Sequence, residues 1–388
     1  MSAIMPLAEL ARLFLKLGAT AFGGPAAHLA MMEDEVVRRR GWLTRESFLD
    51  LVGAVNLIPG PNSTEMAIHI GMTRARLPGL AVAGACFILP ATVITLAFAW
   101  AYVRFGALPQ AGALLYGVKP AVLAVVLSGV WRLGLTAARK LVPAAVGLAV
   151  TVLSLLGLNE VLLILASGAV GLALAVWRHR GGGAPAALAL WGLGPFGASG
   201  LAAAAAPALA LAAPVTLTAL GLFFLKIGSV LFGTGYVLVA FLERGLVHEF
   251  RWLTQPQLLD AIAIGQFTPG PVLSTATFIG YVLAGVPGAL VATAAIFLPS
   301  FVFVALTNPW VPRLRRSPLA AGFLDSVNGG SVGLMLAVLI VLARGALVDL
   351  PAWAIGLAAA FAIFRFRVGA PWVIAGAALA GWAIRAAL

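Results

Sequence analysis

Long apolar stretches alternate with short polar clusters along the whole chain. No formal charge occurs between Leu77 and Val103, for example, and a run of that length can cross ~30 Å of hydrocarbon at ~1.5 Å per residue. A bilayer requires every backbone N–H and C=O to be paired inside the protein, so such runs predict helices. The pattern therefore predicts an all-α polytopic membrane protein.

The second half of the chain repeats the first. Residues 13–61 align without gaps to residues 223–271 at an offset of 210, and a direct count gives 17 identities in these 49 positions. The offset then becomes 209, which pairs Gly71 with Gly280 and Pro90 with Pro299. About six helical segments are expected in each repeat. They lie near 11–32, 48–72, 78–103, 112–131, 141–157 and 160–177, and near 215–242, 258–281, 287–308, 322–343, 350–364 and 368–386.

The basic residues indicate that the two repeats have inverted topologies. Counted after successive segments, Lys and Arg number four, two, one, three, none and two in the first repeat, against two, none, three, one, two and one in the second. High and low values exchange at nearly every step, which the positive-inside rule translates into opposite orientations. The expected organisation is an N-terminal repeat (1–180), an Ala/Gly/Pro-rich linker (181–214) and an inverted C-terminal repeat (215–388). Inversion requires an odd number of crossings between the repeats, for which 186–212 is the candidate.

Two helix breaks are predicted at matching places in both repeats. One is Phe22-Gly23-Gly24-Pro25, and its equivalent is Phe232-Gly233-Thr234-Gly235. The other is the Pro-Gly-Pro sequence at 59–61 and at 269–271. The charge pattern puts both ends of 48–72 on one side of the membrane, and likewise both ends of 258–281, so we expect these segments to enter the membrane, break and return. Paired broken helices are typical of secondary transporters, although these residues also fit simple kinks in spanning helices.

Proline is favoured at the first position of a helix, so Pro25, Pro61 and Pro271 are expected to begin half-helices. The start of a helix presents unpaired N–H groups and a partial positive charge, which together attract an anion. The predicted substrate-binding residues surround these breaks. They are Lys16, Gly23, Gly24, Pro25, His28, Pro59, Gly60, Pro61, Asn62, Ser63, Thr64, Lys226, Gly233, Thr234, Gly235, Tyr236, Gln266, Pro269, Gly270, Pro271, Ser274 and Thr275.

The ionisable candidates each have two interpretations. Lys16 and Lys226 are either buried counter-charges for an anion or residues that reach the interface. Glu65, just after Pro61, either carries a proton during transport or caps its helix locally. His28 is a substrate contact or a core residue. Glu33 and Glu243 are gating candidates, or belong to a solvated membrane face.

Composition excludes several classes of function. The chain is 62% hydrophobic and 10% charged, with a mean hydropathy of +1.05. Its net charge of +12 comes from clusters at the ends of apolar runs, which argues for membrane orientation and against a nucleic-acid partner. A nucleotide-binding loop is not found, the four histidines lack metal-ligand spacing, and Cys86 is the single cysteine. We therefore expect neither a cofactor nor a metal, and no enzyme activity.

The chain resembles the chromate ion transporter (CHR) family in its long, two-domain form. The resemblance rests on Phe22-Gly23-Gly24-Pro25-Ala26-Ala27-His28, Arg40-Gly41-Trp42-Leu43, Pro59-Gly60-Pro61 and Gly117-Val118-Lys119-Pro120-Ala121-Val122, and covers about 11–135 and 221–345. It implies efflux of chromate across a bacterial inner membrane, driven by the proton gradient or the membrane potential. The second repeat departs from the family pattern at Thr234-Gly235-Tyr236 and at Asn328-Gly329-Gly330.

The substrate and the class of protein stay open at this point. The substrate is either chromate, or sulfate or another small oxyanion of similar shape and charge. A membrane scaffold or an intramembrane enzyme would be a different class, but an enzyme needs a nucleophile and base or metal ligands at workable spacing, which do not stand out. The coupling ion, the direction of transport and the oligomeric state are open as well, and a homodimer is among the oligomeric states compatible with the sequence.

Overall fold

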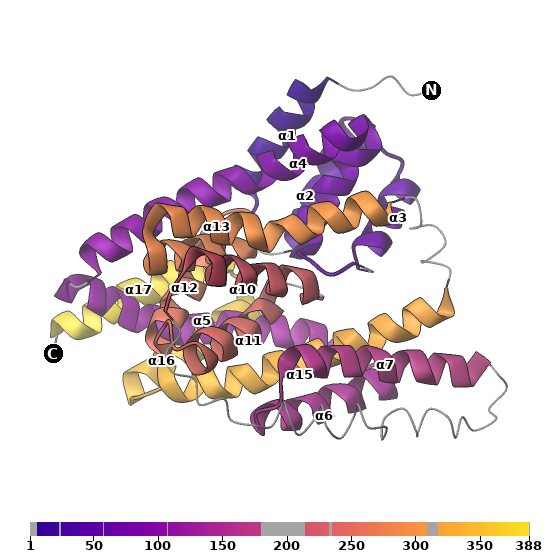
Figure 1. Cartoon of the computed structure of the whole chain (residues 1–388). Coiled ribbons are helices and arrows are strands. Elements are labelled where there is room, and N and C mark those ends of the chain that lie inside the picture. Colours follow the sequence, from indigo (N-terminus) through magenta and orange to yellow (C-terminus); the bar gives the residue numbers. More distant parts are fainter. Residues whose placement is uncertain are drawn as a thin grey trace.

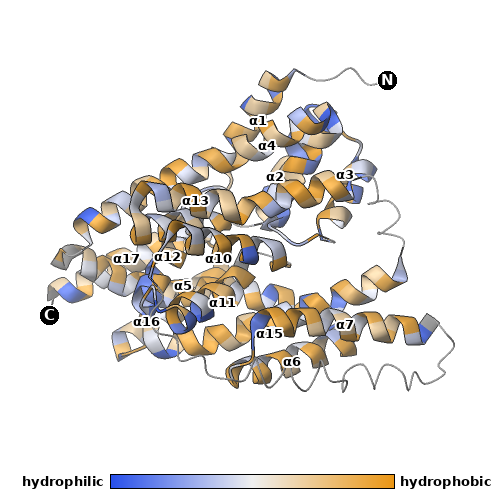
Figure 2. Ribbon diagram, viewed as in Figure 1, coloured by the Kyte–Doolittle hydropathy of each residue, from blue (hydrophilic) through white to orange (hydrophobic). Residues whose placement is uncertain are grey.

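A computed structural model of the chain describes residues 6–22, 25–56, 58–106, 108–179, 214–232, 235–308 and 317–387. These residues form helices and connections and contain no strand (Figure 1). Five of the helices are long and apolar enough to cross a membrane, and hydrophobic positions cover most of their length (Figure 2). The chain is an all-α polytopic membrane protein, as predicted. The predicted linker crossing at 186–212 lies outside the described residues.

The two repeats have matching helices. The first repeat consists of α1 (Leu7–Thr20), α2 (Pro25–Glu33), the π-helix η1 (Asp34–Arg39), α3 (Arg45–Val55), α4 (Asn62–Phe105), α5 (Pro109–Ala137), α6 (Leu141–Leu155) and α7 (Glu160–His179). The second consists of α10 (Leu217–Val230), the short helices η2 (Gly235–Val237), α11 (Leu238–Leu242) and η3 (Glu243–Glu249), then α12 (Gln255–Phe267), η4 (Val272–Ser274), α13 (Thr275–Thr307), α15 (Pro318–Ala346), α16 (Leu350–Phe366) and α17 (Ala370–Ala387).

Helices α4 and α13 are each folded back on themselves. The backbone leaves the helical conformation at Ala75 and Arg76 in α4, and at Ala284 and Gly285 in α13. The hydroxyls of Thr277 and Thr293 lie 2.7 Å apart, whereas sixteen residues of straight helix would separate them by ~24 Å. These reversals fall in the gaps predicted between 72 and 78 and between 281 and 287, so these two predicted boundaries are confirmed.

A tighter first turn explains why the repeats drift by one residue. The first repeat enters α4 directly as α-helix at Asn62, whereas the second enters α13 through η4, a 3₁₀ turn at Val272–Ser274. A 3₁₀ helix rises about 2.0 Å per residue where an α-helix rises about 1.5 Å, so the three residues of η4 cover about the length of four α-helical residues. The second repeat therefore covers a similar path with one residue fewer, which changes the offset from 210 to 209.

The repeats exchange their last two helices. Helix α15 of the second repeat packs mainly on α6 and α7 of the first, and α5 of the first packs mainly on α17 and α16 of the second (Figure 1). Within each repeat, α1 packs on α4 and α10 on α13, while α4 and α13 contact each other across the interface. These reciprocal contacts are those that an approximate twofold relation between the repeats would produce. They agree with the inverted orientation that the exchanged charge bias predicts, and the inversion stays a prediction.

Candidate functional site

The two Pro-Gly-Pro turns are each joined to the other repeat. The Gly60 N–H donates to the Leu231 carbonyl at 2.6 Å, and the Gly270 N–H donates to the Ala21 carbonyl at 2.8 Å. Ala21 and Leu231 are the C-cap residues of α1 and α10, where the first helix of each repeat ends. The helix breaks predicted within each repeat therefore meet in pairs across the interface between repeats.

The half-helix starts fall within one residue of their predicted positions. Helix α2 begins at Pro25, as predicted. Pro61 and Pro271 are N-cap residues, and the helices after them begin at Asn62 and Val272. The expectation that these two prolines are the first helical residues is therefore wrong by one position, because both have extended backbone angles.

A polar pocket of about 180 Å³ lies beside the second of these turns, between α5 and the connection from α16 to α17. We call it the two-arginine pocket. It is lined by Val125, Ser128, Arg132, Gly265, Gln266, Thr268, Gly270, Val272, Ile363, Arg367, Val368, Gly369 and Ala370. Two of the predicted substrate-binding residues, Gln266 and Gly270, are among them.

The pocket is rich in unneutralised donors. Within the described ranges, no carboxylate lies at ion-pair distance from the guanidinium of Arg132 or of Arg367. The Gln266 side chain is 7% exposed, and its buried Nε2 has no hydrogen-bond partner in the described part of the chain. Guanidinium groups bind tetrahedral oxyanions through paired N–H donors, and a buried amide N–H requires an acceptor. This arrangement is suited to a small dianion.

Sequence analysis missed the two arginines, together with Ser128 and Thr268. It treated Arg132 and Arg367 only as charges that orient the helices. Arg132 comes from α5 of the first repeat and Arg367 from the C-cap of α16 in the second, so the exchanged packing alone brings them to the Pro-Gly-Pro turn of the second repeat. The available signal was that neither Arg132 nor Arg367 has an acidic residue close to it in the sequence with which it could pair.

The pocket has no charged equivalent in the other half of the molecule. At the offset of 209, Arg132 corresponds to Val341 and Arg367 to Leu158. At the offset of 210, Gln266 corresponds to Asn56 and Thr268 to Ile58. The two arginines of the pocket therefore have no charged counterparts at the equivalent positions of the other repeat.

Lys16 and Lys226 are both exposed. Of the two interpretations of these lysines, their exposure agrees with side chains that reach the interface and not with buried counter-charges. The Lys16 ammonium lies 2.7 Å from the Glu35 carboxylate and holds the pKa of this carboxyl below its ordinary value of 4.5. Lys226 acts electrostatically on Glu160, which pairs with Arg244 at 3.3 Å. Each lysine therefore interacts with a local acidic residue.

Glu65 and His28 are fully buried. Glu65 is 0% exposed, and its carboxylate lies beside Gly60 and the Ser300 hydroxyl. Neither Glu65 oxygen makes a hydrogen bond of normal geometry in the described ranges. His28 is 1% exposed and packs edge-on against Phe87. Glu65 is thus a buried acid next to the first Pro-Gly-Pro turn, and an ionisable residue buried in a membrane protein is a candidate for a functional role.

The gating candidates have local partners. Glu33 lies 3.7 Å from the Arg45 guanidinium, and the buried Glu243 lies 2.7 Å from His248. Lys16, Glu33 and Glu243 are therefore held in ion pairs or hydrogen bonds away from the two-arginine pocket.

The remaining predicted residues follow the two turns. Asn62 donates to the Asn56 side chain at 2.7 Å, and the Thr275 hydroxyl donates to the Val272 carbonyl at 2.8 Å. Ser63, Thr64 and Ser274 are buried in the first turns after the breaks. Gly235 begins η2, with Tyr236 next to it, and Pro59 and Pro269 open the turns. Gly23, Gly24, Gly233 and Thr234 lie outside the described residues.

Known proteins similar to this chain point to one family. A sequence profile for the family described as "Chromate transporter" matches residues 8–172 and again residues 218–382. A "Chromate transport protein" of Cupriavidus metallidurans is 35% identical over 386 residues, which cover 97% of this chain and 92% of that protein. A "Chromate transport protein" of Pseudomonas aeruginosa is 32% identical, over 96% of this chain and 91% of that protein. No solved structure matches the chain.

Proposed function

The chain belongs to the chromate transporter family, and from this membership we propose that it exports chromate from the cytoplasm across a bacterial inner membrane. The observation that carries the proposal is the two-arginine pocket beside the Pro-Gly-Pro turn of the second repeat. Two guanidinium groups without carboxylate partners offset the charge of a dianion, and the Gln266 amide adds a directional donor.

The charge pattern around the pocket supports the proposed direction of transport. Arg132 precedes Arg139 and Lys140, and Arg367 follows Arg365, so both belong to the richer basic clusters of their repeats. The positive-inside rule assigns such clusters to the cytoplasm. The pocket then opens to the cytoplasmic solution, as an entry site for export requires.

The proposed energy source is the proton gradient, with Glu65 as the group that carries the proton. Its carboxyl lies beside Gly60, whose N–H holds the end of α10. A charge without partners is costly in this buried position, so a change of protonation at Glu65 would be felt at the contact between the repeats. Protonation and anion binding would thus act on the same interface from its two sides.

Flux measurements in inverted membrane vesicles test the proposal. Wild-type protein should take up labelled chromate, because the cytoplasmic face is outside, and a proton gradient should stimulate the uptake. Arg132→Gln and Arg367→Gln should each reduce uptake at least about tenfold, since each removes a charge-assisted contact. Arg139→Gln is the matched control, because Arg139 is exposed in the same basic cluster and does not line the pocket.

Sulfate is the competing substrate, because two guanidiniums offer the same contacts to any tetrahedral dianion. Uptake of sulfate in preference to chromate would redefine the substrate and leave the site in place. Equal exclusion of both ions would contradict the proposed function.

A further inference from the structure

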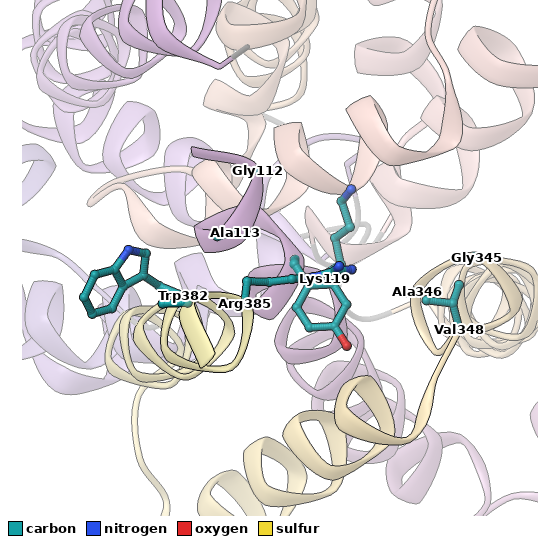
Figure 3. Close-up of a pocket in the computed structure, with 10 residues that line it drawn as sticks. Gly112, Ala113, Lys119, Gly345, Ala346, Val348, Trp382 and Arg385 are labelled. Atoms are coloured by element: carbon teal, nitrogen blue, oxygen red, sulfur yellow. The ribbon is translucent and has the colours of Figure 1, made fainter. Parts of the chain in front are cut away.

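A second basic cavity lies at the opposite end of α5 from the two-arginine pocket. Its volume is about 640 Å³, and it is formed by the start of α5, the connection from α15 to α16 and the end of α17 (Figure 3). Its polar side chains are Tyr116, Lys119 and Arg385, and Trp382 stands at its rim. Figure 3 shows the Arg385 side chain extending from α17 towards Lys119 on α5. We call this the Lys119 cavity.

Arg385 is held in position by its neighbours. Its guanidinium lies over the Tyr116 ring, 4.4 Å from the ring centre, and the Tyr116 hydroxyl donates to the Asp349 carboxylate. Asp349 also accepts from the Ala352 N–H at the start of α16. A cation fixed against an aromatic face keeps its N–H donors at its edge available for a further partner.

Lys119 connects the cavity with the protein interior. Within the described part of the chain, no carboxylate is at ion-pair distance from its ammonium. Its charge nevertheless acts on Asp260 of α12, which is 4% exposed and accepts a 3.0 Å hydrogen bond from Tyr102. A dianion in the cavity would therefore compete with Asp260 for the Lys119 ammonium.

We propose that the Lys119 cavity is a second oxyanion-binding site, occupied on the exit side of the membrane; this rests on the proposed function. Helix α5 lines both sites, and the thirteen residues from Lys119 to Arg132 span ~20 Å of helix. The nearest basic clusters, at Arg104 and Arg344, are single residues, which places the cavity on the side opposite the cytoplasm.

The ligand is the transported tetrahedral oxyanion. A lipid phosphate offers the same chemistry, because Trp382 and Arg385 also suit the headgroup region of a bilayer. The commitment to the transported ion comes from Lys119, because its charge also acts on the buried Asp260, an interaction that a headgroup at the surface does not need. The two sources of anion are separated by the lipids chosen for the test.

The test uses full-length protein in proteoliposomes of phosphatidylcholine alone and, in a parallel set, of phosphatidylcholine with phosphatidylglycerol. Flux is started from the cytoplasmic face, and chromate is added at the exit face. In wild type, exit-side chromate should inhibit net flux by product binding. Lys119→Gln and Arg385→Gln should each raise the inhibitory concentration at least about tenfold, while the half-saturating concentration on the cytoplasmic face changes less than about twofold. Arg104→Gln is the control, since Arg104 is exposed at the same side and does not line the cavity.

Each outcome of this experiment is decisive. Unchanged exit-side inhibition in both variants would overturn the second site. If Lys119→Gln and Arg385→Gln change the inhibition only when phosphatidylglycerol is present, the cavity binds lipid. That result would also overturn the second oxyanion site. Loss of all flux in wild type would contradict the proposed function instead, and binding of labelled sulfate to detergent-solubilised wild type and Arg385→Gln would then still test the cavity. Lys119→Arg should retain inhibition, which separates loss of charge from misfolding.

Discussion

The backbone N–H of Gly270 donates to the carbonyl of Ala21, and the equivalent contact of the other repeat joins Gly60 to Leu231. Each Pro-Gly-Pro turn thereby fixes the end of a helix that belongs to the other half of the chain. Movement of one repeat against the other would change both contacts together. The Gly270 contact borders the two-arginine pocket, and the Gly60 contact borders Glu65, so anion and proton would act on one coupled pair of hydrogen bonds.

Alanine at either turn glycine should destabilise the protein. Gly60 and Gly270 have φ values of +146° and +89°, which side chains with a Cβ rarely adopt. A Cβ at Gly270 would lie 2.8 Å from the Ala91 Cβ, and one at Gly60 would clash with the Glu65 carboxylate. We expect each substitution to cost about 1–3 kcal/mol or more, measured as a lower midpoint of thermal unfolding in detergent.

Gly41→Ala provides the control for this comparison. Gly41 also has a positive φ, +60°, but a Cβ there would meet no atom within 4 Å. Gly41→Ala should lower the free energy of unfolding only by the backbone strain at this position, about 1 kcal/mol. An equal loss at all three glycines would show that the turns are not tightly packed.

Gln266 should contribute to affinity through its free N–H. Gln266→Leu removes one neutral donor to the anion and should raise the half-saturating chromate concentration about three- to tenfold. Gln266→Glu keeps the size but adds a negative charge beside a dianion, so its effect should be larger. Flux assays at several chromate concentrations measure both. A milder effect for Glu than for Leu would contradict an anion site at this position.

Glu65→Gln should uncouple transport from the proton gradient. The amide keeps the volume of the buried acid and cannot exchange a proton, so stimulation by an imposed pH gradient should disappear while exchange of chromate for chromate persists. Glu33→Gln is the control, because Glu33 is paired with Arg45 at the edge of the protein. Stimulation that survives in Glu65→Gln would exclude this residue as the proton carrier.

The Lys16–Glu35 pair predicts a defined pH dependence of stability. Lys16 lowers the pKa of Glu35 in the folded protein, so the pair stabilises the fold above the ordinary Glu pKa of 4.5 and loses this effect as the pH falls through the lowered value. Lys16 is half-exposed, which limits the contribution to about 0.2–1 kcal/mol. Lys16→Met should therefore unfold at a lower temperature than wild type at pH 7. The difference should shrink as the pH falls below the ordinary Glu pKa of 4.5, and a constant difference would indicate lost packing instead.

The sequence predicted those features that depend on local chemistry. Repeated identities revealed the two halves, uncharged runs gave the helices, and proline placed the breaks at Pro25, Pro61 and Pro271 within one residue. The reversal at Ala75 and at Ala284 also coincided with a gap between predicted segments.

What it missed depends on contacts between distant segments. Arg132 and Arg367 meet only because α5 packs on α16 and α17 of the other repeat, and no sequence spacing encodes that exchange. For Lys16 the sequence left two interpretations, a buried counter-charge or a residue that reaches the interface. The structure pairs it with Glu35, nineteen residues later, a contact that the local sequence does not indicate.

The exchanged hairpins mean that neither half is a self-contained unit. Helices α6 and α7 have their main partner in α15, and α16 and α17 have theirs in α5, so the covalent connection between the halves is not what keeps them together. A chain cut between residues 180 and 214 should stay assembled as a complex of two pieces. The first half made alone would leave exposed the face of α5 that packs on α16 and α17.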